Sequence, residues 1–321
     1  MQVLSLSELE SAAEIVYQAL TPSPQINWPL LSARCGCEVW VKHENTNPTG
    51  AFKIRGGLVY LNRLRQQSPD CPGVVTATRG NHGQSVALAA TRNDIGAVVV
   101  VPRGNSVGKN RAMAALGCEL IEHGADFDEA VAHAAELAQA RGLHRMPSFH
   151  SDLVSGVATY ALEFFRAQPD LERVYVPIGL GSGICGMISA RDALGLNVEI
   201  VGVVSTGARC YQLSLDAGHA VSTDSANTLA DGMAVRVPNA EALSVMSRGV
   251  AEVVAVSDEE ILQAMRWYYE DVHQLAEGAG AAGLAALLQQ RTVNKGRKVG
   301  VVLSGGNVDS SIFSNVLSLP V

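Results

Sequence analysis

Lys53 is the residue whose type and surroundings best suit covalent chemistry. Its neighbours Phe52 and Ile54 are apolar, a Pro-Thr-Gly turn at 48–50 precedes it, and a Gly-Gly pair follows at 56–57. Most lysines are solvated surface charges, but apolar surroundings lower the pKa of an ammonium group and leave a fraction of free amine. Glycines let another group approach closely. The pattern therefore predicts a reactive amine of the kind that Schiff-base chemistry needs.

A glycine-rich loop provides a candidate phosphate site. It follows a predicted buried strand at 173–177, opens a helix that runs to 193, and consists of Gly179, Leu180, Gly181, Ser182 and Gly183. Backbone N–H groups and the positive end of the helix dipole converge at such a junction, where an anion can bind. The simpler alternative is that the glycines only let the helix pack on the strand.

The same loop also fits a nicotinamide-cofactor fingerprint, because Gly181, Gly183 and Gly186 match Gly-x-Gly-x-x-Gly. That alternative expects an acidic residue about 20 positions later, at the end of the next strand. The sequence there is Gly-Val-Val-Ser at 202–205, without an acid, although Arg209 could serve an NADP enzyme. A nicotinamide oxidoreductase is therefore weakened as an alternative but stays open.

Strand and helix patterns alternate along most of the chain. The five successive apolar residues at 97–101 are typical of a buried parallel strand. Repeated βα units with short connections imply an α/β fold with a mostly parallel sheet and right-handed crossovers. Only 205–257 has a periodicity too weak to assign. The length allows one large or two medium domains.

The composition restricts the class of protein. Hydrophobic residues make up 47% and charged residues 17%, which suits a sheet covered on both faces. The net charge of −7, without a lysine and arginine cluster, argues against nucleic acid as a partner. No apolar run reaches the roughly 18 residues of a membrane span, and 1–20 lacks the basic residues of a signal peptide, so we expect a cytoplasmic protein. The six cysteines lack zinc-site spacing and should be reduced.

The segment Pro-Thr-Gly-Ala-Phe-Lys-Ile-Arg-Gly at 48–56 resembles the cofactor-lysine motif of the pyridoxal-phosphate (PLP) enzymes of fold type II, in the serine and threonine dehydratase and serine racemase family. The glycine loop and two further motifs fall in the family's order. The resemblance implies two domains, each an open, mostly parallel twisted sheet covered by helices. The large PLP-binding domain would comprise 1–64 and 148–321, and a small mobile domain 65–147. It also suggests a homodimer.

The resemblance implies where PLP would bind. Lys53 would hold it covalently, Asn81 of Gly-Asn-His-Gly would hydrogen-bond the phenolic oxygen of the ring, and Ser304 would face the pyridine nitrogen. Without the resemblance, an asparagine at a helix start is most often a cap. The glycine loop would bind the phosphate, although Leu180 and Ser182 depart from the family's four consecutive glycines. Because backbone N–H groups do most of the binding there, we expect function to survive.

The reaction implied by the resemblance is α,β-elimination of a β-hydroxy-L-amino acid to a 2-oxo acid and ammonia, which is dehydratase (ammonia-lyase) chemistry. Lys53 would remove the α-proton, and the leaving hydroxide would be protonated through the cofactor phosphate or a water. The substrate carboxylate would be bound at Thr78, Gly80, Asn81 and His82.

The amino acid that is accepted stays open at this stage. Phe149 and its neighbour His150 could line a pocket for phenylserine, although Phe149 could equally be part of the core. Arg79 could bind the acidic side chain of 3-hydroxyaspartate, and threonine or serine are further candidates. The alternative is a PLP enzyme of β-replacement type, such as a cysteine synthase, whose asparagine loop normally reads Thr-Ser-Gly-Asn-Thr-Gly, unlike the sequence at 78–83.

Three positions differ informatively within the family. Arg79 stands where serine racemase has a serine that acts as the second base, and arginine stays charged, so we expect little racemase activity. Val203 and Arg209 stand where many relatives hold a divalent cation with an acidic pair, so we expect no metal. Glu277 matches an acidic position of the family in the large domain, where it would support the residues that contact the cofactor. Because the sequence ends soon after Ser304, we also expect no feedback control by isoleucine.

Overall fold

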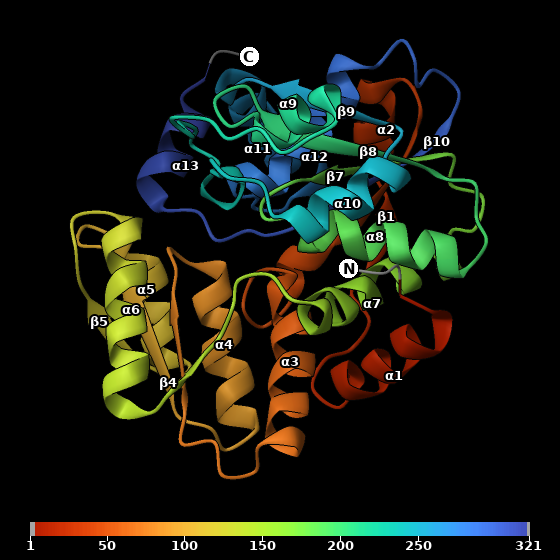
Figure 1. The fold of residues 1–321 in the computed structure, drawn as a ribbon. Helices are drawn as coiled ribbons and strands as arrows, with labels where there is room; N and C mark the ends of the chain where they lie inside the picture. Colours follow the sequence, from red (N-terminus) through yellow and green to blue (C-terminus); the bar gives the residue numbers. More distant parts are fainter. Residues whose placement is uncertain (1–3, 320–321) are drawn as a thin grey trace.

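The computed structural model describes residues 4–319 and contains two β-sheets (Figure 1). The larger sheet has six strands in the order β1 (Gln25–Asn27), β2 (Glu38–His43), β10 (Lys298–Leu303), β7 (Arg173–Pro177), β8 (Glu199–Ser205) and β9 (Glu252–Val256). The smaller sheet has four strands in the order β5 (Glu119–Glu122), β4 (Ala97–Val101), β3 (Val74–Ala77) and β6 (His144–Arg145). Neighbouring strands are parallel throughout, except that β1 pairs antiparallel with β2.

The helices cover both faces of the larger sheet and surround the smaller one. Around the smaller sheet are α4 (Asn81–Arg92), α5 (Val107–Ala115) and α6 (Phe127–Arg141), at the lower left of Figure 1. The others are α1 (Leu6–Tyr17), α2 (Pro29–Cys35), α3 (Lys53–Gln67), α7 (Ser151–Ala167), α8 (Ser182–Ala193), α9 (Cys210–Ala217), α10 (Ala240–Gly249), α11 (Asp258–Val272), α12 (Gly278–Gln289) and α13 (Ser310–Leu317), with the 3₁₀ turns η1 (Glu44–Thr46) and η2 (Asp231–Met233). None of the helices within residues 4–319 combines the length and apolar character needed to cross a membrane.

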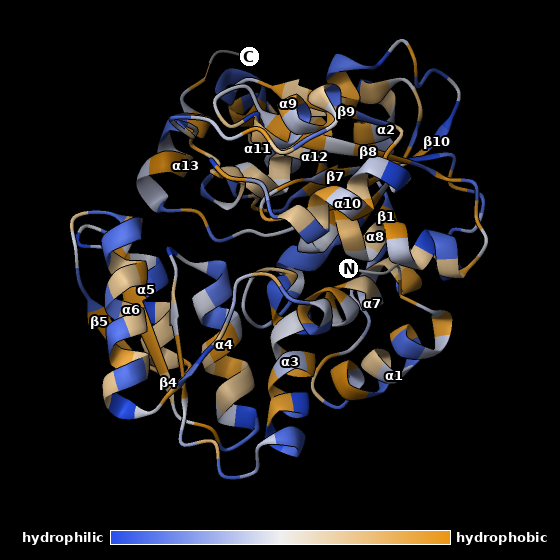
Figure 2. Cartoon of the chain, in the orientation of Figure 1, coloured by the Kyte–Doolittle hydropathy of each residue, from blue (hydrophilic) through white to orange (hydrophobic). Residues whose placement is uncertain are grey.

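Buried strands explain the apolar runs in the sequence. All five residues of β4 are buried, and Figure 2 shows this strand in the hydrophobic colour. In β10, Val301 packs into one core with α11 and α12, and Val302 packs into another with α7 and α8. Successive residues of a strand point to opposite faces, so both faces of the larger sheet are buried. The predicted α/β class with two mostly parallel sheets is confirmed.

The chain enters the smaller sheet from α3 and leaves it into α7, and these two helices are in backbone contact. A Cβ atom on Gly156 would lie 2.3 Å from Arg55 O, and one on Gly56 would lie 2.6 Å from Leu153 O. The Arg55 guanidinium also donates to Thr159 Oγ1 at 2.9 Å. Glycine at both positions therefore permits a helix spacing that any side chain would prevent.

Candidate active site

The turn before Lys53 is hydrogen-bonded to the segment that follows β10. Phe52 N donates to Ser304 O at 3.0 Å, and Gly306 N donates to Gly50 O at 2.9 Å. Lys53 is the first residue of α3 and Ser304 is the first after β10. The segment at the carboxyl end of β10 therefore holds Lys53 close to Ser304. This proximity is needed if both residues contact one cofactor.

The amine of Lys53 has no hydrogen bond or ion pair to any residue in 4–319, and its Nζ lies 5.0 Å from the centroid of the Phe52 ring. Burial lowers the pKa of Lys53, and the Glu277 carboxyl partly opposes this. The sequence predicted this direction from the apolar neighbours. A half-buried amine with a lowered pKa is suited to nucleophilic chemistry.

Asn81 joins the two sheets at the same point. Its Nδ2 donates to Glu277 Oε1 at 2.6 Å, and its Oδ1 accepts from Asn307 Nδ2 at 2.8 Å. Glu277 precedes α12, and its backbone N donates to Gly305 O at 3.0 Å. Burial raises the pKa of Glu277, against the opposing effects of Lys109 and the Asn81 hydrogen bond. Asn81 is therefore fixed from both sides near Ser304.

The predicted substrate-carboxylate loop leads into the start of α4. Gly80 precedes this helix without a side-chain cap, and the first turn has no acidic residue. Thr78 Oγ1 accepts from Gly80 N at 3.1 Å. The His82 ring is buried and its Nε2 has no partner within the described residues. Burial and Lys53 lower the pKa of His82 to about 3, so the ring is neutral. Arg79 is exposed.

The glycine loop is supported from behind and open at its helix end. Gly181 has a φ of 105°, a left-handed conformation that favours glycine, and it starts α8 without a side-chain cap. Tyr211 Oη donates to Leu180 O at 2.8 Å. Ser182 is buried as the first residue of α8, whose first turn has no acidic residue. Next to Gly183, an added Cβ would meet no atom closer than 3.6 Å. These amides are available to an anion.

Phe149, predicted as a substrate contact, is half-buried and packs against the core formed by α7 and α8. Its neighbour His150 is directed elsewhere: it caps α7 by accepting from Asp152 N at 3.1 Å, and its ring lies 5.1 Å from the Tyr60 ring. The exposed Arg209 donates to Gln212 Oε1 at 2.7 Å. No group of three or more His, Cys, Asp or Glu side chains within residues 4–319 is arranged to hold a metal ion.

Sequence reasoning missed three supporting residues. Asn307 is three residues after Ser304 and was assigned no role, although its Nδ2 donates to Asn81 Oδ1 and to the carbonyl of Thr49. Tyr211 carries the glycine loop from a helix in the unassigned region 205–257. Lys109 was not singled out either, although its backbone N donates to the side chain of Ser106, the cap of α5.

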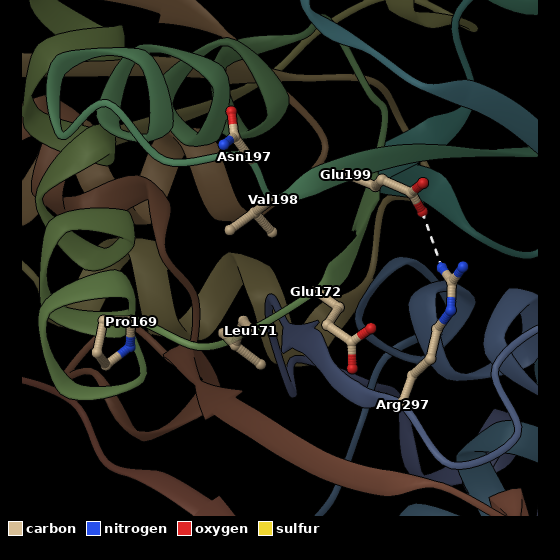
Figure 3. Close-up of a pocket in the computed structure, with 7 residues that line it drawn as sticks. All are labelled: Pro169, Leu171, Glu172, Asn197, Val198, Glu199 and Arg297. Carbon is tan, nitrogen blue, oxygen red and sulfur yellow. Dashed lines mark hydrogen bonds and ion pairs between the residues drawn. The ribbon is translucent and has the colours of Figure 1, made fainter.

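A separate pocket of about 360 Å³ lies at the opposite edge of the larger sheet (Figure 3). Glu172 and Arg297 lie just before β7 and β10, and Glu199 begins β8. Arg297 Nη1 is 3.1 Å from Glu199 Oε2, the dashed contact in Figure 3. Because ligands of open parallel sheets bind at the carboxyl ends of the strands, we do not assign the site to this pocket.

The residues present fit PLP on their own chemistry. The cofactor has an aldehyde, a phosphate, a phenolic oxygen and a ring nitrogen. A low-pKa amine at Lys53, free amides at the start of α8, the Asn81 amide and the Ser304 hydroxyl complement these groups. The unpartnered Nε2 of His82 further indicates that a polar group belongs in this space.

Comparisons with known proteins agree with this fit. A family model described as pyridoxal-phosphate dependent enzyme matches residues 16–305. The chain belongs to this family.

The L-threonine ammonia-lyase of Thermotoga maritima is 34% identical to this chain over 317 residues, 98% of this chain and 79% of that protein. The biosynthetic L-threonine dehydratase of Escherichia coli is 32% identical over 92% of this chain, which spans only 58% of that enzyme. The structure of maize serine racemase is 28% identical, with a TM-score of 0.92 and coverage of 98% and 97% of the two chains.

These likenesses confirm several expectations. The predicted PLP fold type II group of serine and threonine dehydratases and racemases is confirmed, as is the cofactor PLP. At the level of enzyme class, the predicted PLP-dependent ammonia-lyase is also confirmed. The nicotinamide alternative is wrong, because Gly181, Gly183 and Gly186 belong to a PLP enzyme.

Proposed function

We propose that this protein is a dehydratase of L-threonine and L-serine, which it converts to the corresponding 2-oxo acid and ammonia. The observation that carries the proposal is that Lys53 follows Phe52, whose N donates to Ser304 O, and that its amine is influenced by the Glu277 carboxyl that accepts from Asn81. The names of the relatives support the substrate class, because threonine ammonia-lyases and dehydratases match nearly the whole chain. Phenylserine and 3-hydroxyaspartate are secondary candidates that rest on Phe149 and Arg79 alone.

Each residue has a role in this proposal. PLP supplies the electron sink that makes the α-proton acidic. Lys53 would hold the cofactor, and its Nζ is the base that would remove that proton. The amides that start α4 bind the substrate carboxylate, and those that start α8 bind the phosphate. Asn81 and Ser304 would orient the cofactor ring.

Other aspects of the protein are part of the same proposal. We infer that the smaller sheet, residues 65–147, moves as a small domain against 1–64 and 148–321. We also propose that the protein is a homodimer in the cytoplasm. It would hold no metal ion and would have no nucleic acid or membrane partner. The Ile54 and Leu58 side chains of α3 pack into the core of β3 and α4, so α3 would form part of the boundary between the domains.

The test measures release of 2-oxo acid and ammonia by the PLP-loaded enzyme from four amino acids: L-threonine, L-serine, L-threo-3-phenylserine and L-threo-3-hydroxyaspartate. We expect kcat/KM to be highest for threonine or serine. Lys53→Ala should abolish turnover and the visible absorbance of bound PLP. Lys298→Ala, at the far edge of the sheet, is the control lysine. Preference for phenylserine would overturn the substrate assignment, and a tenth of wild-type activity in Lys53→Ala would overturn the role of Lys53.

A further inference from the structure

Lys109 connects the two sheets at a point that none of the assigned contacts uses. It is the third residue of α5, beside the smaller sheet, and its Nζ lies 3.2 Å from Oδ2 of Asp231 in η2. The Lys109 side chain is only 14% exposed, whereas that of Asp231 is 48% exposed. A second contact runs beside it, because Ser106 Oγ is 2.5 Å from Asp309 Oδ1. The ion pair therefore spans the two parts of the molecule.

The ion pair lies next to a glycine of each site loop, directly at Lys109 and through the following residue, Gly232, at Asp231. A Cβ atom on Gly80 would be 2.8 Å from Lys109 Cδ, so the lysine stem lies on the residue that precedes α4. A Cβ atom on Gly179 would be 2.2 Å from the carbonyl oxygen of Gly232, which directly follows Asp231. The pair, together with Gly232, therefore links Gly80 of the carboxylate loop to Gly179 of the phosphate loop.

We propose that the Lys109–Asp231 ion pair sets the spacing between the carboxylate loop at 78–82 and the phosphate loop at 179–183, and so positions the site for substrate. The inference rests on the proposed function of these loops. Neither side chain touches the reacting atoms, so both are positioning residues. A partly exposed ion pair adds little to stability, and its effect is on the geometry of the loops.

The charges around the pair support this role. Glu277, the partner of the Asn81 amide, is influenced by both members: Lys109 lowers its pKa and Asp231 raises it. The pair and the Asn81 hydrogen bond therefore lie in one group of charges between the sheets. Separation of Lys109 from Asp231 would alter both the loop spacing and the field at Asn81.

The chain offers a matched control. Arg236 Nη2 lies 2.6 Å from Asp128 Oδ2 and joins the segment before α10 to α6, so it too links the larger part to the smaller sheet. Its two side chains are 49% and 67% exposed, and within residues 4–319 neither has a hydrogen bond or ion pair to either loop. Loss of this pair removes an ion pair between the two parts without changing the support of Gly80 or Gly179.

The first experiment compares Lys109→Gln, Asp231→Asn, the double variant and Arg236→Gln as PLP-loaded enzymes. Without the pair, the two loops are separated in part of the enzyme population, and these molecules do not bind substrate. KM should therefore rise as the binding-competent fraction falls, while kcat stays nearly unchanged. We expect about a tenfold rise in KM for both single variants and no further rise in the double variant. Lys109→Arg should restore much of the affinity, and Arg236→Gln should behave as wild type. A fall in kcat at unchanged KM, or additive single effects, would overturn the inference.

A second readout does not depend on turnover. Hydrogen exchange of the backbone amides at 78–84 and 179–184, measured without substrate, should be faster in Lys109→Gln and unchanged in Arg236→Gln. Equal exchange in the two variants would contradict the inference. If the wild-type enzyme releases no 2-oxo acid from any amino acid, the proposed function fails, while the exchange result still decides whether the ion pair controls the loops.

Discussion

Asn81 Nδ2 lies 2.6 Å from Glu277 Oε1, so the first residue of α4 is bound to the residue that precedes α12. The two residues are 196 positions apart, and their helices pack beside different sheets. The Glu277 side chain does not cap its own helix. Its carboxyl instead accepts a hydrogen bond from the side-chain amide of Asn81, which we propose contacts the cofactor ring.

This contact predicts different effects for two substitutions. Glu277→Gln keeps an oxygen that can accept from Asn81, whereas Glu277→Ala removes the acceptor and leaves a buried amide hydrogen unpaired. Leaving a buried donor unpaired costs about 1–3 kcal/mol, so kcat/KM should fall about 5- to 100-fold in Glu277→Ala and much less in Glu277→Gln. Steady-state kinetics with threonine and serine test this. Equal losses in both variants would assign the effect to charge and not to positioning of Asn81.

Arg79 predicts the stereochemical outcome. Its side chain is exposed, and a guanidinium keeps its proton at any working pH, so it cannot serve as a base on the second face of the α-carbon. We expect no measurable D-serine from L-serine in the wild-type enzyme. Arg79→Ser should introduce racemisation while elimination continues, and Arg79→Ala is the control without a hydroxyl. Chiral chromatography of the reaction mixture measures both products, and D-serine from the wild type would contradict the prediction.

Two buried histidines predict a loss of stability in mild acid. Burial lowers the pKa of His43 to about 4, and burial together with Lys53 lowers that of His82 to about 3. In the unfolded chain both titrate near 6.5, so below that pH the unfolded state binds protons that the folded state does not. Each ring should cost about 2 kcal/mol of the free energy of unfolding between pH 7 and pH 5.

Urea unfolding of the cofactor-free protein at pH 7, 6 and 5 measures this loss. His43→Gln should remove roughly half of it. The raised pKa of Glu277 acts with the opposite sign, because a carboxyl that resists ionisation in the folded state gains stability as the pH falls. The loss should therefore be steeper in Glu277→Gln. Stability that is constant over this range would contradict the neutral state of the two rings.

The contact between α3 and α7 predicts a large effect of a single methyl group. Gly156→Ala places a Cβ atom 2.3 Å from Arg55 O, a backbone atom that can move only with its helix. Overpacking of this kind costs about 1–3 kcal/mol. Gly96→Ala is the control, because its Cβ would meet only Pro72 O, at 3.6 Å. Thermal unfolding of the two variants should differ clearly, and equal Tm values would contradict the close contact.

The sequence predicted what depends on near neighbours. The strands at 97–101 and 173–177, and the glycine loop that opens the helix ending at 193, follow from apolar runs interrupted by glycine and proline, and their bounds agree with β4, β7 and α8. The low pKa of Lys53 has its cause partly in adjacent apolar residues. These features need no knowledge of the rest of the chain.

What the sequence could not predict depends on distant partners or weak patterns. The partners of Asn81 are Glu277 and Asn307, both from the other end of the chain. In the region 205–257, α9 has only eight residues and η2 three, too few for a helical period to stand out. Tyr211, which supports the glycine loop, was therefore missed with its helix. The Phe149 side chain could have packed in the core or lined a substrate pocket, and the periodicity of the sequence does not distinguish the two positions.

The glycine contacts that join α3 to α7 also limit how the smaller sheet can move. The chain passes into that part after α3 and returns from it before α7, so the part is tethered at two points held a fixed distance apart. A body tethered in this way can turn about the line through its tethers, but it cannot slide or twist freely. We therefore expect opening and closing to follow a single hinge axis. Substrate that enters would then meet the Asn81 loop from one direction only.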